Sequence, residues 1–99
     1  MAKYVLTNKA VDDLTKIWDY TYEVWSENQA NKYYKLIIET CEGIAKAPEV
    51  GKNYDEIIKE ILGFKVGKHI IFYRKRKPKG IEVVRILHER MDLKNRLEE

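Results

Sequence analysis

The sequence has little of what a disulfide, a metal site or a membrane span would need. Its 99 residues include one cysteine, Cys41, which excludes an internal disulfide and suits a reducing cytosol. The histidines, His69 and His88, do not have the ligand spacing of a metal site with Cys41, so no metal is predicted. No apolar run approaches the roughly 18 residues of a membrane span, and residues 1–6 contain no signal-peptide core. We therefore expect one cytoplasmic domain, residues 1–99.

Motifs for cofactor binding and covalent catalysis are also missing. The sequence has no P-loop, no dinucleotide-binding glycine pattern and no zinc signature. Cys41 falls on the apolar face of a predicted helix, so it is interpreted as a core residue and not as a nucleophile. No cofactor is therefore predicted.

Positive charge is concentrated in one stretch. The net charge of +3 is modest, but residues 65–80 contain seven lysines and arginines and no acid. Two interpretations fit this stretch equally. The cations can keep a solvated hairpin from pairing with other sheet edges, or they can form a patch that attracts an acidic partner.

The first half of the chain is predicted to be helical, beginning with an amphipathic helix over residues 9–26. Thr7 or Asn8 can cap it, and Asp12 and Asp13 are expected in its first turn, where the helix dipole favours negative charge. Its apolar stripe consists of Ala10, Leu14, Ile17, Trp18, Thr21, Val24 and Trp25.

A second helix follows after a short link, which implies an antiparallel helical hairpin. Ser26 and Gln29 match a capping box at its start, and Pro48 ends it because the residue before proline avoids the helical region. Its apolar stripe consists of Ala30, Tyr33, Ile37, Cys41, Ile44 and Ala45. Aromatic residues at helical spacing are more often core than a partner site, and the core interpretation is preferred for four of them: Trp18, Trp25, Tyr33 and Tyr34.

After Pro48 the pattern changes from helical to alternating. Strands rich in β-branched and aromatic residues are predicted over residues 61–66, 69–76 and 81–88. Gly67 and Lys68 suit a two-residue type II′ turn, with glycine first, and residues 77–80 form the next turn, in which proline presets φ. Residues 3–7 alternate weakly and are a further candidate strand. Two segments have weaker signals, residues 49–54 as a loop and residues 55–60 as one short helical turn or a loop.

The last strand is expected to be internal, because both of its faces carry aliphatic residues. Strict alternation puts Ile81, Val83, Arg85 and Leu87 on one face and Glu82, Val84, Ile86 and His88 on the other. Residues 91–99 are predicted to form a short final helix, capped by Asp92, with Leu93 and Leu97 facing inward. The predicted fold class is α+β, in the order β-α-α-β-β-β and a short C-terminal helix, with the helical hairpin packed on an antiparallel sheet.

Two runs carry a resemblance to a known family: GKHIIFYR at residues 67–74 and VRILHERMD at residues 84–92. Together they resemble the RelE/ParE toxin superfamily, and specifically its ParE branch. Upstream residues also fit, so the resemblance covers nearly the whole chain: Ala10, Asp13, Leu14, Ile17, Tyr20, Ala30, Ala47, Pro48 and Gly51. The fold expected from the residues is also the fold of that family.

The resemblance implies the toxin of a type II toxin–antitoxin pair. Proteins of the ParE branch inhibit DNA gyrase by binding, and a ParD-like antitoxin neutralises them by wrapping around the toxin. Nucleic acid would then be contacted only through gyrase, and the toxin would not be an enzyme in its own right. A toxin-fold remnant that only binds its antitoxin is equally compatible with the sequence.

The alternative function is that of a RelE-like, ribosome-dependent mRNA endonuclease. A metal-free nuclease needs a general base, a general acid and cations at the phosphate, and the basic candidates are His69, Arg85, His88 and Arg90. The RelE branch keeps a basic residue near the position of Leu62 and an aromatic residue after the equivalent of Arg90, and this sequence has neither. No catalytic residue is therefore predicted, and a contact that ParE relatives make through arginine near Leu62 is in doubt.

Candidate partner surfaces are predicted in two sets. The residues proposed to contact gyrase are His88, Arg90, Met91, Leu93, Lys94 and Arg96. The residues proposed to contact the antitoxin are Lys65, His69, Arg74, Arg76, Trp18 and Trp25.

Overall fold

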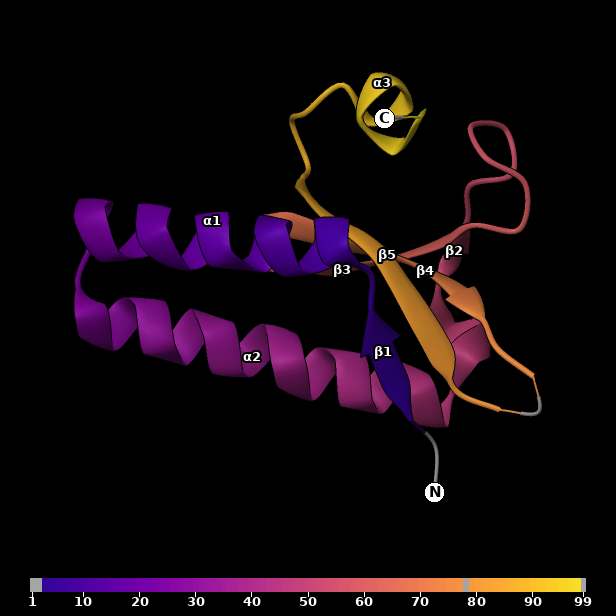
Figure 1. Cartoon of the computed structure of the whole chain (residues 1–99), viewed down its shortest axis with the longest axis horizontal. Helices are drawn as coiled ribbons and strands as arrows, with labels where there is room; N and C mark the ends of the chain where they lie inside the picture. Colours follow the sequence, from indigo (N-terminus) through magenta and orange to yellow (C-terminus); the bar gives the residue numbers. More distant parts are fainter. Residues whose placement is uncertain (1–2, 78, 99) are drawn as a thin grey trace.

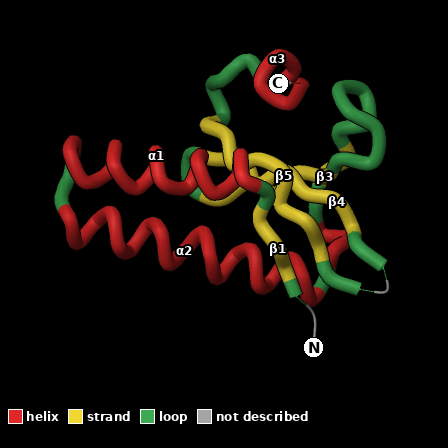
Figure 2. Tube along the Cα trace, viewed as in Figure 1, coloured by secondary structure: helices red, strands yellow, loops and turns green. Residues whose placement is uncertain are grey.

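The computed structural model describes residues 3–77 and 79–98. Within these residues five strands form one sheet, in the order β1-β5-β4-β3-β2, with a helical hairpin on one face and a short helix on the other (Figures 1 and 2). The predicted α+β fold is therefore confirmed. The elements are β1 (Tyr4–Leu6), α1 (Asn8–Val24), α2 (Glu27–Lys46), the 3₁₀ helix η1 (Pro48–Val50), β2 (Lys52–Asn53), β3 (Leu62–Val66), β4 (His69–Lys75), β5 (Ile81–His88) and α3 (Leu93–Glu98).

Hydroxyl side chains begin both long helices, as the sequence predicts. The Thr7 Oγ1 accepts a hydrogen bond from the Ala10 amide at 3.1 Å, and the Ser26 Oγ accepts one from the Gln29 amide at 3.0 Å. The expectation for the acids is wrong, because the first turn of α1 contains none. Asp13 instead lies in the second turn and is buried.

The β3–β4–β5 meander is antiparallel, as predicted, and β1 adds to its edge parallel to β5. The β3–β4 turn has Gly67 at φ 56°, which agrees with the positive φ that a type II′ turn needs at its first position. At the start of β5, Gly80 has φ 96°, and a Cβ there would collide with the Lys3 carbonyl oxygen. Only glycine lets β1 approach this closely. Pro78, expected to preset the β4–β5 turn, lies outside the described residues.

The two segments with weak sequence signals have different outcomes. Lys52 and Asn53 form the short strand β2, which pairs with the start of β3, and a two-residue strand is too short to show alternation. Residues 55–60 form turns and no helix, although the amides of Ile57 and Ile58 both donate to the Tyr54 carbonyl, at 2.9 and 3.1 Å.

A β-bulge breaks the alternation predicted for β5. Phe72 is opposite Arg85, but the next residue of β4, Tyr73, is opposite Val83, so Val84 is the extra residue. An extra residue shifts the phase of every side chain beyond it by one. The predicted face of Ile81, Val83, Arg85 and Leu87 is therefore wrong. Ile86 joins Ile81 and Val83 in the core under the helices, and Leu87 lies in the core on the other side.

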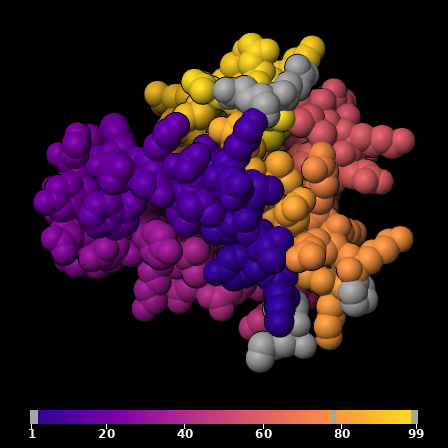
Figure 3. All heavy atoms as spheres, viewed as in Figure 1, coloured from indigo at the N-terminus to yellow at the C-terminus, as the bar shows by residue number. Residues whose placement is uncertain are grey.

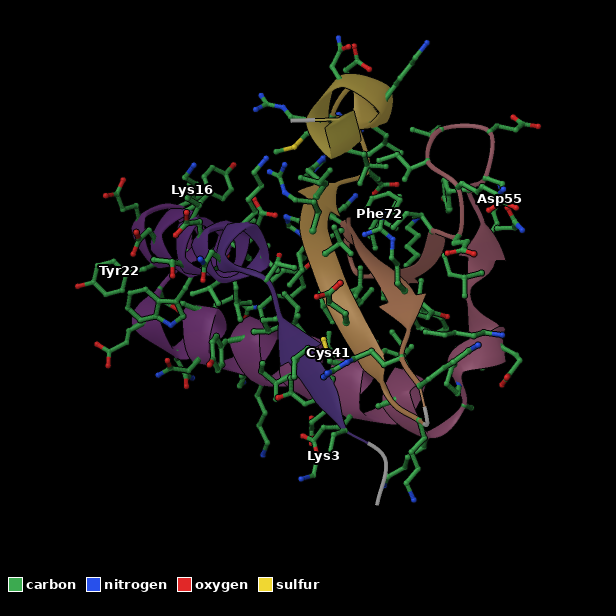
Figure 4. All side chains as sticks on the ribbon, turned by 45° about the vertical axis from the view of Figure 1, so that its right-hand side comes forward. Lys3, Lys16, Tyr22, Cys41, Asp55 and Phe72 are labelled. Atoms are coloured by element: carbon green, nitrogen blue, oxygen red, sulfur yellow. The ribbon has the colours of Figure 1, made fainter. Side chains whose placement is uncertain are left out.

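The two faces of the sheet carry two separate cores, so β5 is covered on both sides as expected. The larger core packs the helical hairpin on the sheet and includes Cys41, whose burial raises the pKa of its thiol to about 12. The smaller core lies under α3; Figure 4 shows Cys41 and Phe72 in these two positions. The smaller core consists of Ile61, Ile70, Phe72, Leu87 and Leu97, with Leu93 partly buried against it.

The helical hairpin is longer than the sheet that it covers (Figure 1). Its overhanging end carries the last turn of α1, where Trp25 is 73% exposed. Tyr34 on α2 is also exposed, and Trp18 and Tyr33 are half-buried. The core interpretation is therefore wrong for Trp25, because no strand lies beneath this end of the hairpin to cover it. It is also wrong for Tyr34, which lines a surface hollow with Leu6 and Leu14.

Candidate functional site

A groove runs between α1 and the end of the sheet at which β4 begins and β5 ends. It consists of two adjoining hollows, of about 430 and about 420 Å³, which share five residues: Tyr20, Thr21, His69, His88 and Arg90. The first hollow also includes Asp13, Lys16, Ile17, Ile86 and Met91. The second also includes Trp25, Gln29, Tyr33 and Lys68. We call this surface the histidine groove.

The two histidines of the chain meet in the middle of the groove. His69 is the first residue of β4 and His88 the last of β5, and the register puts them directly opposite each other. Their ring centroids are 5.3 Å apart in an edge-to-face arrangement. Tyr33 reaches over from α2, so that its hydroxyl lies 2.7 Å from the His69 Nδ1. Three elements therefore fix this part of the groove.

The surroundings of His69 favour its neutral ring. Burial lowers the pKa of His69 to about 4, and the neighbouring His88 contributes to the shift. The Nδ1 of His88 accepts a hydrogen bond from the Arg90 amide at 3.1 Å. Burial also raises the pKa of the Tyr33 hydroxyl, which stays protonated near neutral pH. At pH 7 His69 is thus an uncharged ring held by Tyr33.

Exposed cations surround this neutral centre. Lys16, Lys68 and Arg90 line the two hollows, and Lys16 projects from α1 away from α2 (Figure 4). The nearby Glu89 forms an ion pair with Lys65 at 3.1 Å, which lowers the pKa of its carboxyl. The groove therefore combines an apolar floor with a positive rim.

The acid that lines the groove, Asp13, is already paired. Its two oxygens accept hydrogen bonds from the Arg85 Nε and Nη2 at 2.8 and 3.0 Å, and the Ile86 amide donates a third at 3.0 Å. Sequence reasoning missed this pair, because it put Asp13 in the first turn of α1 and counted Arg85 among the basic site residues. One signal was present: Asp13 follows Ala10 at the i+3 spacing of the apolar stripe, so it had to be buried and needed a cation.

The sequence matches the family model described as ParE toxin of type II toxin-antitoxin system, parDE, over residues 4–93. The chain belongs to the ParE toxin family. Toxin ParE1 of Mycobacterium tuberculosis is 35% identical over 96 residues, which are 97% of this chain and 98% of the relative. Toxin ParE1 of Caulobacter vibrioides is 31% identical over 98% and 99% of the two chains, and Toxin ParE of Escherichia coli is 32% identical over 98% and 94%.

A solved structure agrees with the fold. It is of a chromosomal ParDE TA system from P. aeruginosa, and the two chains superpose with a TM-score of 0.73 at 21% sequence identity. The match covers 89% of this chain and 96% of that chain. The chain is thus a type II toxin of the ParE branch, as the two sequence runs predict.

The predicted gyrase-contact residues of this ParE-family toxin are divided between two places. His88, Arg90 and Met91 line the histidine groove. Lys94 and Arg96 are exposed on α3, whereas Leu93 is partly buried in the smaller core and contributes to packing.

The predicted antitoxin-contact residues are more widely spread. Lys65 and His69 lie at the groove end of the sheet and Trp25 lines the groove. Arg74 and Arg76 are at the opposite end of the β4–β5 hairpin. Arg74 follows His69 by five residues along β4, which is about 17 Å at the rise of a β-strand, and Arg76 lies beyond the end of β4. A further residue of the set, Trp18, lines a separate hollow between α1 and α2, stacks on Tyr22 at 5.2 Å and donates to the Asn31 Oδ1 at 3.1 Å.

Leu62 lies far from the histidines of the ParE-family fold. It begins β3 opposite Tyr73, and lines a hollow with Arg74 at the far end of the sheet. Its apolar character therefore says little about chemistry in the groove. Within the described residues, no group of histidine, cysteine, aspartate and glutamate side chains is placed to hold a metal ion, and no helix is long and apolar enough to cross a bilayer.

Proposed function

We propose that this ParE-family toxin inhibits DNA gyrase by binding, and that a ParD-like antitoxin neutralises it. Family membership supports the target, because gyrase inhibition is what the resemblance to the ParE branch implies. The structural observation that carries the proposal is the histidine groove, which has the composition of a protein-binding surface. Its exposed aromatic residues, Tyr20 and Trp25, belong to the residue types that most often dominate binding energy at interfaces.

The state of the histidines is a second argument for binding. Cleavage of RNA without a metal needs one group to take up a proton and another to donate one. His69 is uncharged at neutral pH, and its Nδ1 is within 2.7 Å of the Tyr33 hydroxyl, so it is poorly suited to donate a proton to a leaving group. His88 and Arg90 can contact an anion, but these two do not supply both proton transfers.

The antitoxin is proposed to present an acidic, amphipathic segment. Its apolar side chains would cover the exposed aromatic residues of the helical hairpin, and its acids would pair with the cations of the sheet. Since Lys65 lies on β3 beside the start of β4, and Arg76 follows the end of β4, we expect one segment that contacts both to run along the β3–β4 side of the sheet. Complementary charge of this kind raises the association rate and fixes the register.

The test uses the purified chain with gyrase and, separately, with translating ribosomes. We expect loss of supercoiling and accumulation of cleaved DNA after denaturation of gyrase, while translated mRNA stays intact. Induction in cells should give filamentation and a DNA-damage response, and co-expression of a cognate ParD-like antitoxin should restore growth. Ribosome-dependent mRNA cleavage that is lost in Arg90→Ala, with supercoiling unaffected by the wild type, would instead identify an endonuclease.

A further inference from the structure

The C-terminal helix α3 is held by an apolar contact and a polar one. Leu97 is buried in the smaller core, and Leu93 packs at its edge. The polar contact comes from Arg85, whose Nη1 donates to the Arg96 carbonyl oxygen at 2.7 Å. That carbonyl lies in the last turn of α3, where a helix leaves its carbonyls without internal partners and favours a nearby cation. In the space-filling view the C-terminal residues (yellow) cap one end of the molecule, beside the start of α1 (Figure 3).

The same guanidinium is anchored in the interior. Its Nε and Nη2 bind both oxygens of Asp13, and the two side chains are only 11% and 10% exposed. Asp13 is fixed in turn by the Ile86 amide. Arg85 therefore joins three elements through one rigid group: α1 by Asp13, β5 by its own backbone, and α3 by the Arg96 carbonyl. Lysine has one ammonium on a flexible stem and cannot reproduce this planar set of donors.

The segment between β5 and α3 carries groove residues. The amides of Arg90 and Met91 both bond to His88, at 3.1 Å to its Nδ1 and 3.0 Å to its carbonyl oxygen. His88 thus fixes the start of this segment, and its other end is fixed where α3 is tied to Arg85. Arg90 and Met91 line the groove between these two anchors.

We propose that Arg85 is a positioning residue for the partner surface. Anchored on Asp13, it holds α3 so that the preceding turn presents Arg90 and Met91 to the histidine groove. It does not touch the partner itself. The proposal rests on the proposed function only in its last step, that the groove binds gyrase.

The test replaces the guanidinium with a group that keeps the charge. Arg85→Lys leaves a cation beside Asp13 but removes the donor to the Arg96 carbonyl. We expect amide exchange at Arg90, Met91 and Arg96 to rise roughly tenfold, since one charge-assisted hydrogen bond has about that effect on an equilibrium. Exchange in β3 and β4 should be unchanged, and the concentration needed for half-inhibition of gyrase should rise by about the same factor.

Two further variants separate positioning from stability. Ile44→Val is the control, because it weakens the larger core on the other face of the sheet and should leave exchange in α3 as in the wild type. The double variant Asp13→Leu with Arg85→Met replaces the buried pair with apolar groups of similar size, which proteins often tolerate. It should fold, and it should show the same faster exchange at Arg90, Met91 and Arg96, even if Arg85→Lys does not fold.

Each result decides one step. If amide exchange at Arg96 stays as in the wild type in both Arg85→Lys and the double variant, Arg85 does not hold α3. If exchange becomes faster at Arg96 but stays as in the wild type at Arg90 and Met91, Arg85 does not position the groove residues. Faster exchange at all three with unchanged gyrase inhibition would overturn the functional role. If the wild type itself does not inhibit gyrase, the proposed function fails, and the exchange pattern still decides whether Arg85 positions the groove.

Discussion

The base and the tip of the helical hairpin have the same apolar periodicity but opposite environments. At the base, Ala10 and Ile37 are completely buried against the sheet. At the tip, Val24 is 52% exposed and Trp25 73% exposed, because the helices continue beyond the sheet, and Tyr22 lies at this far end (Figure 4). Periodicity thus identifies a helix face, whereas burial depends on whether another element lies under that face.

The difference shows how one hairpin can serve both stability and binding. The base packs into the larger core, so its side chains stabilise the fold. The tip leaves aromatic side chains in solvent beside the histidine groove, so they contribute to the free energy of binding when a partner buries them. If this division is correct, substitutions at the base should act on the free energy of unfolding and substitutions at the tip on affinity.

The largest effect is expected at the base. Ile37→Ala should lower the free energy of unfolding by about 3 kcal/mol, because it removes a fully buried side chain and leaves a cavity. Leu36→Ala is the matched control, since the neighbouring Leu36 is 45% exposed and its truncation should cost less than about 0.5 kcal/mol. Urea unfolding measures both, and equal effects of the two variants would remove the distinction between the faces of α2.

A smaller effect is expected at the basic end of the β4–β5 hairpin. Arg76→Glu with Lys77→Glu should slow association with the cognate antitoxin about tenfold at low salt and reduce its salt dependence, because attraction becomes repulsion. Arg74 stays unchanged in this variant, since it lies opposite Glu82 and its reversal would also destabilise the sheet. Stopped-flow mixing measures the rate, and an unaltered on-rate at low salt would rule out steering by this end.

The groove floor should make stability depend on pH. The pKa of His69 is about 4 in the folded chain and near 6.5 when unfolded, so the unfolded chain takes up the proton first as pH falls. The contribution is complete above about pH 6.5 and is lost between there and pH 4. Between pH 7.5 and 5, the wild type should lose about 1 kcal/mol more than His69→Gln, a value reduced because the ring is partly exposed. Parallel losses in the two proteins would show that His69 does not couple to folding.

The smallest effect on stability is expected at the tip. Trp25→Ala should change the free energy of unfolding by less than about 0.5 kcal/mol, since the indole is mostly in solvent. The same substitution should weaken partner binding, as expected of an aromatic residue that a partner buries. Urea unfolding and titration with the antitoxin measure the two effects, and a stability loss near that of Ile37→Ala would place the tip in the core.

The fold could be predicted from the sequence wherever local signals agree with tertiary packing. The caps at Thr7 and Ser26, the turn at Gly67 and the limits of β5 all follow from local chemistry. The bulge at Val84 could not be predicted, because a bulge depends on the pairing of two strands and leaves no mark in one of them. It is because of this bulge that Ile86, and not Leu87, shares the face of Ile81 and Val83.

The candidate site could be predicted only in part. The cluster after β5 was identified, since polar residues that follow an apolar strand are visible in the sequence. Its enclosure by Tyr20 and Tyr33 was not, because it requires the helical hairpin to lie beside the end of the sheet. The pairing of Asp13 with Arg85, 72 residues apart, was missed for the same reason. The run of cations in residues 65–80 suggested one positive patch. In the structure this segment folds back on itself, so its cations lie at both ends of one hairpin.

The most direct test of the histidine groove as the gyrase surface compares two matched double variants. Tyr20→Ala with Lys16→Glu changes an aromatic residue and a cation in the groove, and Tyr34→Ala with Lys35→Glu changes the same pair of residue types outside it. The measurement is the concentration of toxin that halves gyrase supercoiling, with urea unfolding of each variant alongside. We predict a rise of at least about tenfold for the groove variant, no change for the other, and wild-type stability for both. Equal inhibition by the two variants would contradict the assignment of the groove.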